Sequence, residues 1–150
     1  MMRLRFRIAP ARRGTVAIEF ALVAPFFLTL LGGMVELGFA SYQAMEAQDA
    51  AEAGALYAAK HGYDAAGISA AVVNASGSGG VAASPAPTVF CGCPGTAGVS
   101  AISCASTCAS GDQPGQYVRV NASVAHETIL SYLGLPLPAT LTGQSTVRVH

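Results

Sequence analysis

A single apolar run dominates this sequence and limits what the chain can fold into. The sixteen residues from Phe20 to Val35 carry no charge, and the apolar character continues past Glu36 to Ala40. A helix that spans a bilayer needs roughly 20 mainly apolar residues. The run therefore predicts a transmembrane helix, provided that its two flanking carboxylates, Glu19 and Glu36, lie near an interface or meet a partner.

Basic residues are concentrated before this run. The sequence up to Gly14 contains five of the eight Lys and Arg residues and none of the eight acidic ones; the five are Arg3, Arg5, Arg7, Arg12 and Arg13. The positive-inside rule then predicts a cytoplasmic N-terminus and an exported C-terminal part. No second run of comparable length follows, so we expect a single-pass protein of the inner (cytoplasmic) membrane. A charge division of this kind indicates a membrane boundary and no nucleic-acid partner.

The order of features around residue 14 separates three kinds of N-terminus. An ordinary cleaved signal peptide fits poorly, because the apolar run is long for its h-region. An uncleaved signal anchor is the second reading. The third rests on the stretch "RRGTVAIEFALVAPFF", in which Gly14 is followed by four residues, then Glu19, then Phe20 and the apolar helix. This order resembles the substrates of a prepilin peptidase, which cuts before the helix and leaves it on the mature protein.

The N-terminal third as a whole, "RRGTVAIEFALVAPFFLTLLGGMVELGFASYQAMEAQDAAEAGALYAA", resembles the TadE-like family of minor pilins, or pseudopilins, of the bacterial Tad/Flp tight-adherence pilus. The last strands, "YVRVNASV" and "GLPLPATLTGQSTVRV", resemble the family more weakly. The resemblance implies cleavage between Gly14 and Thr15, with Glu19 and Phe20 as the processing and assembly determinants. Major pilins of this system carry Glu-Tyr and are far shorter, so Glu-Phe in a longer chain favours a minor component.

A carboxylate at Glu19 needs a physical reason. An ionised acid within hydrocarbon costs about 2.5–3.5 kcal/mol even on the lenient insertion scale, and such residues persist where they pair. Cleavage after Gly14 would create an α-amine on Thr15. We expect the amine of a neighbouring subunit to meet Glu19 and to set the register of bundled helices; the alternative is a glutamate at headgroup level with little effect.

The helix is expected to continue well beyond the membrane. Lys60 and His61 suit a last helical turn, and Gly62 suits the position after it. A stripe of small residues repeats along this segment with spacings of three and four, and it predicts close helix packing. From Ala40 onward the stripe consists of Ala40, Ala44, Ala47, Ala51, Gly54 and Ala58, with Gly33 and Leu37 before it and Glu36 at its edge. Its partner could be another subunit or the chain's own domain.

The exported part predicts a small α+β fold. Residues 64–74 suggest a short helix capped by Asp64. Residues 116–125, "QYVRVNASVA", alternate polar and apolar side chains and form the clearest strand, with further strands at 87–91 and 145–149. The proline-broken apolar segment 129–138 is expected to cover the sheet. The fold class is therefore α+β and pilin-like: a long N-terminal helix, membrane-spanning in its first half, followed by a short antiparallel sheet.

Four cysteines, all in the exported part, complete the pattern. Cys91, Cys93, Cys104 and Cys108 are an even set in an oxidising compartment and predict two disulfides. Pairs that join 91 or 93 to 104 or 108 are favoured over a strained Cys91–Cys93 bridge, and the order within that crossing stays open. A zinc site or a thiol oxidoreductase is the alternative use of four thiols, although the first pair is spaced too tightly for zinc.

No catalytic motif is apparent, so we expect no enzyme, no cofactor, no metal and no small-molecule substrate. The predicted organisation is a basic leader (1–14), a transmembrane and assembly helix (15–62) and a small disulfide-stabilised exported domain (63–150). The expected function is that of a minor pilin in a Tad/Flp-type pilus for surface adherence. Its expected partners are the membrane, a prepilin peptidase, other pilin subunits and the assembly machinery. The alternative is a membrane-anchored exported binding domain that does not polymerise.

Overall fold

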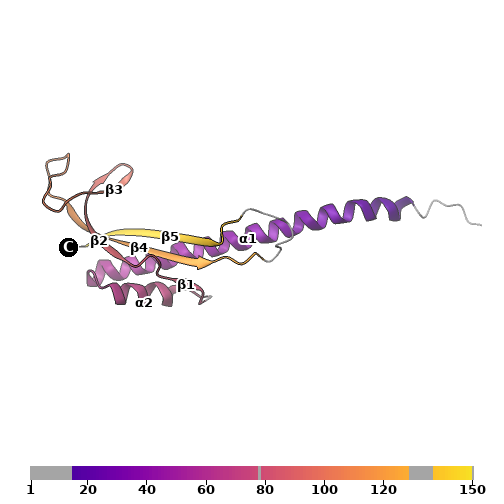
Figure 1. Ribbon diagram of the computed structural model, residues 1–150, viewed down its shortest axis with the longest axis horizontal. Coiled ribbons are helices and arrows are strands. Elements are labelled where there is room, and N and C mark those ends of the chain that lie inside the picture. The colour runs from indigo at the N-terminus through magenta and orange to yellow at the C-terminus, as the bar shows by residue number, and fades with distance from the viewer. Residues whose placement is uncertain (1–14, 78, 129–136, 150) are drawn as a thin grey trace, which may run out of the picture.

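One long helix organises the molecule. The computed structural model describes residues 15–77, 79–128 and 137–149. Helix α1 (Thr15–His61) is 47 residues long, which corresponds to about 70 Å, and it continues through Pro25. It ends as the sequence predicts, because Gly62 adopts a φ of 78° and its N–H donates to the Ala58 carbonyl at 2.9 Å. The N-terminal half of α1 projects beyond the rest of the fold (Figure 1).

A second, short helix turns back beside α1. Helix α2 (Ala65–Ala75) begins after Asp64, whose side chain accepts a hydrogen bond from the Ala66 N–H. Ile68 and Val72 form its buried face. This helix and its cap confirm the expectation drawn from residues 64–74.

Five antiparallel strands make one sheet: β1 (Val81–Ala82), β2 (Thr88–Gly95), β3 (Gly98–Ala101), β4 (Gly115–Ala125) and β5 (Thr140–Val149). Strand β4 is central. Strand β5 pairs along one edge of β4, whereas β2 and β1 follow one another along its other edge. Strand β3 forms a hairpin with β2. The α+β class with a long apolar helix and a small antiparallel sheet is thus confirmed.

The hydrophobic core lies between α1, α2 and the sheet. Alternate residues of β4 point into it, as the polar–apolar pattern of this strand predicts, and Val118 and Val120 are fully buried. Ala47, Ala51 and Ala58 meet them from α1. The core is therefore built across the predicted boundary at residue 62, which itself stays a prediction, because the second half of α1 supplies one of its layers.

Several expectations concern residues outside this description. The basic leader with Gly14 lies outside the described residues, as do residues 129–136 of the apolar segment expected to cover the sheet. Two elements were not predicted at all. These are strand β1, which has only two residues, and strand β3, which forms a hairpin with β2; β2 itself extends the strand expected at 87–91.

Candidate functional site

The N-terminal half of α1 is apolar and uncovered by the described part of the chain. Phe20, Leu22, Phe26 and Met34 are each more than 60% exposed. One helix, from Val16 to His61, is long and apolar enough among the described residues to cross a membrane. The part of α1 that an aqueous environment would not tolerate is therefore the part that the sheet does not cover (Figure 1).

The predicted processing residues lie at the far end of this segment. Thr15 is the first residue of α1, and Glu19 and Phe20 follow within its first two turns. Both side chains are exposed, Phe20 by 72%. A carboxylate and an aromatic ring are thus both accessible to a partner just after the predicted cleavage junction.

The small-residue stripe lies at the other end of α1 and packs within the chain. Ala47, Ala51 and Ala58 are completely buried, and Ala44 is half-buried. Glycine is required at Gly54, because a Cβ there would lie 2.6 Å from Val72 of α2 and 2.8 Å from Val120 of β4. The partner of the stripe, which the sequence left open, is the chain's own sheet and second helix.

The buried face of α1 is both wider and shorter than the stripe predicts. Ala50 and Ala55 are also buried, because α1 packs against two layers, the sheet on one side and α2 on the other. Towards the membrane end, Leu37 is 52% exposed and so does not belong to this face. Its neighbour Glu36 is buried instead.

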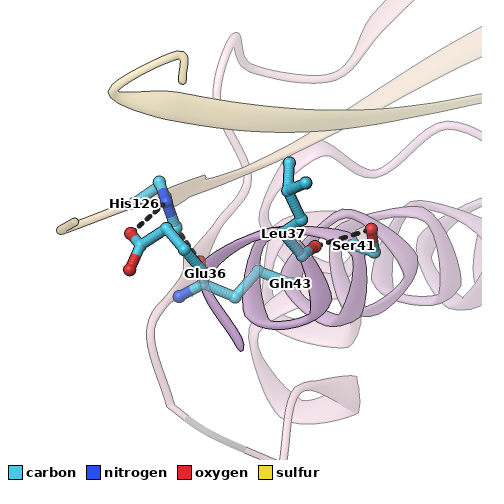
Figure 2. Close-up of polar contacts among 5 residues, drawn as sticks. All are labelled: Glu36, Leu37, Ser41, Gln43 and His126. Carbon is cyan, nitrogen blue, oxygen red and sulfur yellow. Dashed lines mark hydrogen bonds and ion pairs between the residues drawn. The ribbon is translucent and has the colours of Figure 1, made fainter. Parts of the chain in front are cut away.

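Glu36 enters a polar cluster that the sequence analysis missed. Only 1% of Glu36 and 5% of His126 are exposed. Oε1 of Glu36 lies 3.5 Å from Nε2 of His126, and Nδ1 of His126 donates to Oε1 of Gln43 at 2.6 Å (Figure 2). His126 follows the end of β4, so this cluster joins the sheet to α1 at the point where α1 leaves the fold.

The two ring nitrogens of His126 face different partners. The Gln43 carbonyl oxygen can only accept, so Nδ1 of the imidazole carries a hydrogen. Nε2 faces the Glu36 carboxyl group. A polar partner inside the fold lowers the cost of burying Glu36.

Two signals in the sequence point to this cluster in hindsight. Glu36 interrupts an apolar segment at the edge of the stripe, and His126 comes directly after the clearest strand. Gln43 and His126 are 83 positions apart in the sequence, which hides their proximity. They come together only because β4 packs on α1.

The four cysteines form two crossing disulfides. Cys91 is bonded to Cys104, and Cys93 to Cys108, so both bridges join β2 to the segment that follows β3. A hollow of about 390 Å³ lies beside them and is lined only by uncharged residues, among them Ser100 and Thr107. Among the described residues, no group of three or more His, Cys, Asp or Glu side chains has a geometry suited to a metal ion.

Comparison with known proteins bears on the long helix. Residues 14–56 match the family model described as TadE-like protein. No curated protein sequence and no solved structure gives a significant match. The matched segment begins at the predicted cleavage junction and takes in most of α1, including the first part of the small-residue stripe. From Gly14 to Leu56 this chain is thus confirmed as similar to TadE-like proteins, a family related to the Tad pilus.

Proposed function

We propose that this chain is a minor pilin, or pseudopilin, of a Tad/Flp-type pilus that supports surface adherence. It is made as a precursor in the inner membrane, with its basic leader in the cytoplasm and its sheet exported. Its role is structural, and its chemistry is limited to cleavage by a prepilin peptidase and to assembly with other pilin subunits. The TadE-like match over residues 14–56 supports the pilus assignment.

The observation that carries this proposal is the bare apolar half of α1 beginning at Thr15. A protein that only needed an anchor would be served by any apolar helix. Here the apolar helix follows, in the sequence, a glycine that comes after two arginines, and it carries an exposed carboxylate at Glu19. These features fit a helix that is kept after cleavage and later transferred from lipid to contacts with other helices.

On assembly, contacts with neighbouring subunits would replace contacts with lipid around the exposed side chains in the apolar half of α1. After cleavage, the α-amine of Thr15 in one subunit would meet the Glu19 carboxylate of its neighbour. Such a pair removes two charges that hydrocarbon would not accept singly, and it fixes the axial offset between adjacent helices. The exposed rings of Phe20, Phe26 and Phe27 would fill the space between them.

Cleavage is tested by sequencing the mature N-terminus. The full chain is purified from membranes of cells that have or lack the prepilin peptidase. We expect Thr15 as the first residue in the former, and an intact leader in the latter. G14L should abolish cleavage, because a bulky side chain keeps the protease from the backbone, which glycine leaves open. A11L, which adds similar bulk three residues earlier, is the control and should be processed normally.

A leader retained in peptidase-positive cells would contradict the proposal and would favour the anchored, non-polymerising alternative. Incorporation is a separate question. Mass spectrometry of sheared filaments should detect the cleaved chain at a low ratio to the major subunit, whereas an anchored passenger would stay in the membrane fraction.

A further inference from the structure

The fold begins to cover α1 at Glu36, although Leu37 and Phe39 just beyond it are still exposed. From Val16 to Val35 the side chains are exposed or half-buried, and Glu19 is the one charged residue among them. Twenty residues of α-helix are about 30 Å long, which equals the thickness of a bilayer's hydrocarbon core. The next residue, Glu36, is buried by the fold. The folded part of the chain therefore begins where a membrane of ordinary thickness would end.

Described residues next to β4 and β5 lie close to this boundary. His126 follows the end of β4, and its side chain lies next to Glu36. Its backbone N–H donates a hydrogen bond to the backbone carbonyl of Ala139 at 2.9 Å, next to the start of β5. The end of β4 and the start of β5 are thus both near the level of Glu36. A span that stops at residue 35 would bring this end of the sheet against the headgroups.

The side chains just beyond Glu36 suit that position. Phe39 is 39% exposed and Tyr42 is 55% exposed, and they lie about 4.5 and 9 Å further along the helix axis. Aromatic rings of this kind favour the membrane–water interface, where Tyr keeps its hydroxyl in water. The next charged residue, Glu46, comes about 15 Å beyond Glu36, past the headgroup layer.

We propose that the exported domain rests directly on the bilayer surface, with the Glu36–His126 pair at headgroup level as the stop that sets the depth of α1. The contact with His126 keeps Glu36 at this level, while Phe39 and Tyr42 contact lipid. If His126 is removed, Glu36 loses this contact, and this turn of α1 moves towards water. This inference requires that α1 spans the membrane, but it is independent of cleavage and of pilus assembly.

The chain contains no tryptophan, so a single introduced tryptophan reports its own depth. The full chain is reconstituted in vesicles of phosphatidylcholine and phosphatidylglycerol that contain phosphatidylcholine brominated either near the headgroup or near the chain ends. F39W and Y42W should be quenched several-fold more by the shallow bromines than by the deep ones. F27W, in the middle of the span, should show the reverse preference, and L56W, far up α1, should not be quenched.

These controls separate the possible failures. If F27W is quenched by deep bromines while F39W and Y42W are not quenched at all, the domain stands away from the lipid and the docking proposal is wrong. The same result would arise if a second copy of the chain covered these rings. If F27W itself escapes quenching, α1 does not span the bilayer, and the inference fails together with the membrane anchor.

The role of the pair is tested in the F39W background. H126Q should reduce shallow quenching several-fold, because it removes the ring nitrogen that faces the Glu36 carboxyl group. Adding E36Q to H126Q should restore the quenching, since glutamine at position 36 has no carboxylate to be drawn towards water, and E127Q, which changes an exposed neighbour, should have no effect. Unchanged quenching in H126Q, with helix content preserved by circular dichroism, would show that the pair does not set the depth.

Discussion

Among single residues, Glu19 and Glu36 show how one apolar helix accommodates two carboxylates in different ways. Glu36 finds a partner within the fold, because His126 lies 3.5 Å away. Glu19 is exposed on a half-helix that no other described part of the chain covers. The first acid is therefore satisfied by folding, whereas the second requires a partner from another molecule if it is to lie within a membrane or a helical bundle.

For Glu19 we expect the variant E19Q to be exported but not incorporated into filaments. The glutamine lacks the charge that would hold the α-amine of a neighbouring subunit, and it keeps nearly the same volume. Mass spectrometry of sheared filaments should show a loss of at least tenfold relative to the unmodified chain. E127Q is the control for loss of a carboxylate elsewhere. Normal incorporation of E19Q would exclude an amine–carboxylate contact as the assembly determinant.

Gly54 is a second residue whose identity is restricted by the fold, because there is no space for a side chain at this position. A methyl group there would meet Val72 and Val120, which are both fully buried and β-branched, so neither can move aside easily. We expect G54A to lower the free energy of unfolding by about 1–3 kcal/mol. G38A is the matched control, since its added carbon meets nothing within 4 Å.

The two glycine variants are compared by urea unfolding of the full chain in detergent, followed by circular dichroism. G38A should stabilise the helix by up to about 1 kcal/mol, because alanine has the better helix propensity. Equal stability of G54A and G38A would mean that α1 does not approach α2 and β4 as closely as the structure indicates.

Among the elements, the two disulfides act on the β2–β3 hairpin and the segment after it. Cys91 lies in the middle of β2, and Cys93 lies further along it, opposite Ser100 in the hairpin. We expect C93S/C108S to destabilise this region by about 3 kcal/mol, the chain-entropy value for a loop of roughly 15 residues. Strands β4 and β5 should keep their protection, because their core contacts come from α1.

Hydrogen exchange measured by mass spectrometry on the full chain checks this prediction. Faster exchange should be confined to the region between residues 93 and 114. Loss of protection in β4 or β5 would show instead that the disulfides also hold these two strands in place.

The elements also show what sequence patterns can and cannot reveal. The end of α1, the cap of α2 and the alternation of β4 each depend on a few neighbouring residues, and all were predictable. Strand β3, "GVSA", has small residues with no alternation, and it exists because β2 pairs with it. The Glu36–His126 contact was not predictable, because the residues next to Glu36 and His126 in the sequence do not indicate that the end of β4 will lie beside α1.

For the whole molecule, the second half of α1 and the sheet form one folding unit. Ala47, Ala51 and Ala58 belong to the same core as Val118 and Val120. A boundary drawn at the end of the helix therefore divides this core, although the sequence alone favours that boundary because Gly62 and Asp64 mark it clearly.

Two fragments test whether the second half of α1 and the sheet fold as one unit. A fragment of residues 34–150 should fold, form both disulfides and unfold cooperatively, because it retains all of the core. A fragment of residues 63–150 should not, because Ile68, Val72 and the inner face of β4 would be left in water. Circular dichroism and thiol titration after export to an oxidising compartment distinguish the two. Cooperative unfolding of the shorter fragment would show that the sheet is stable without α1.

The backbone contact between β5 and α1 has a mechanical consequence. Gly143 lies so close to the backbone of Ala47 that a side chain at Gly143 could not be accommodated. The helix itself runs without a break from Thr15 to His61. A pulling force applied at the N-terminal end of α1 would therefore be transmitted directly to the sheet through this close contact, because the described helix has no flexible break that could absorb the force.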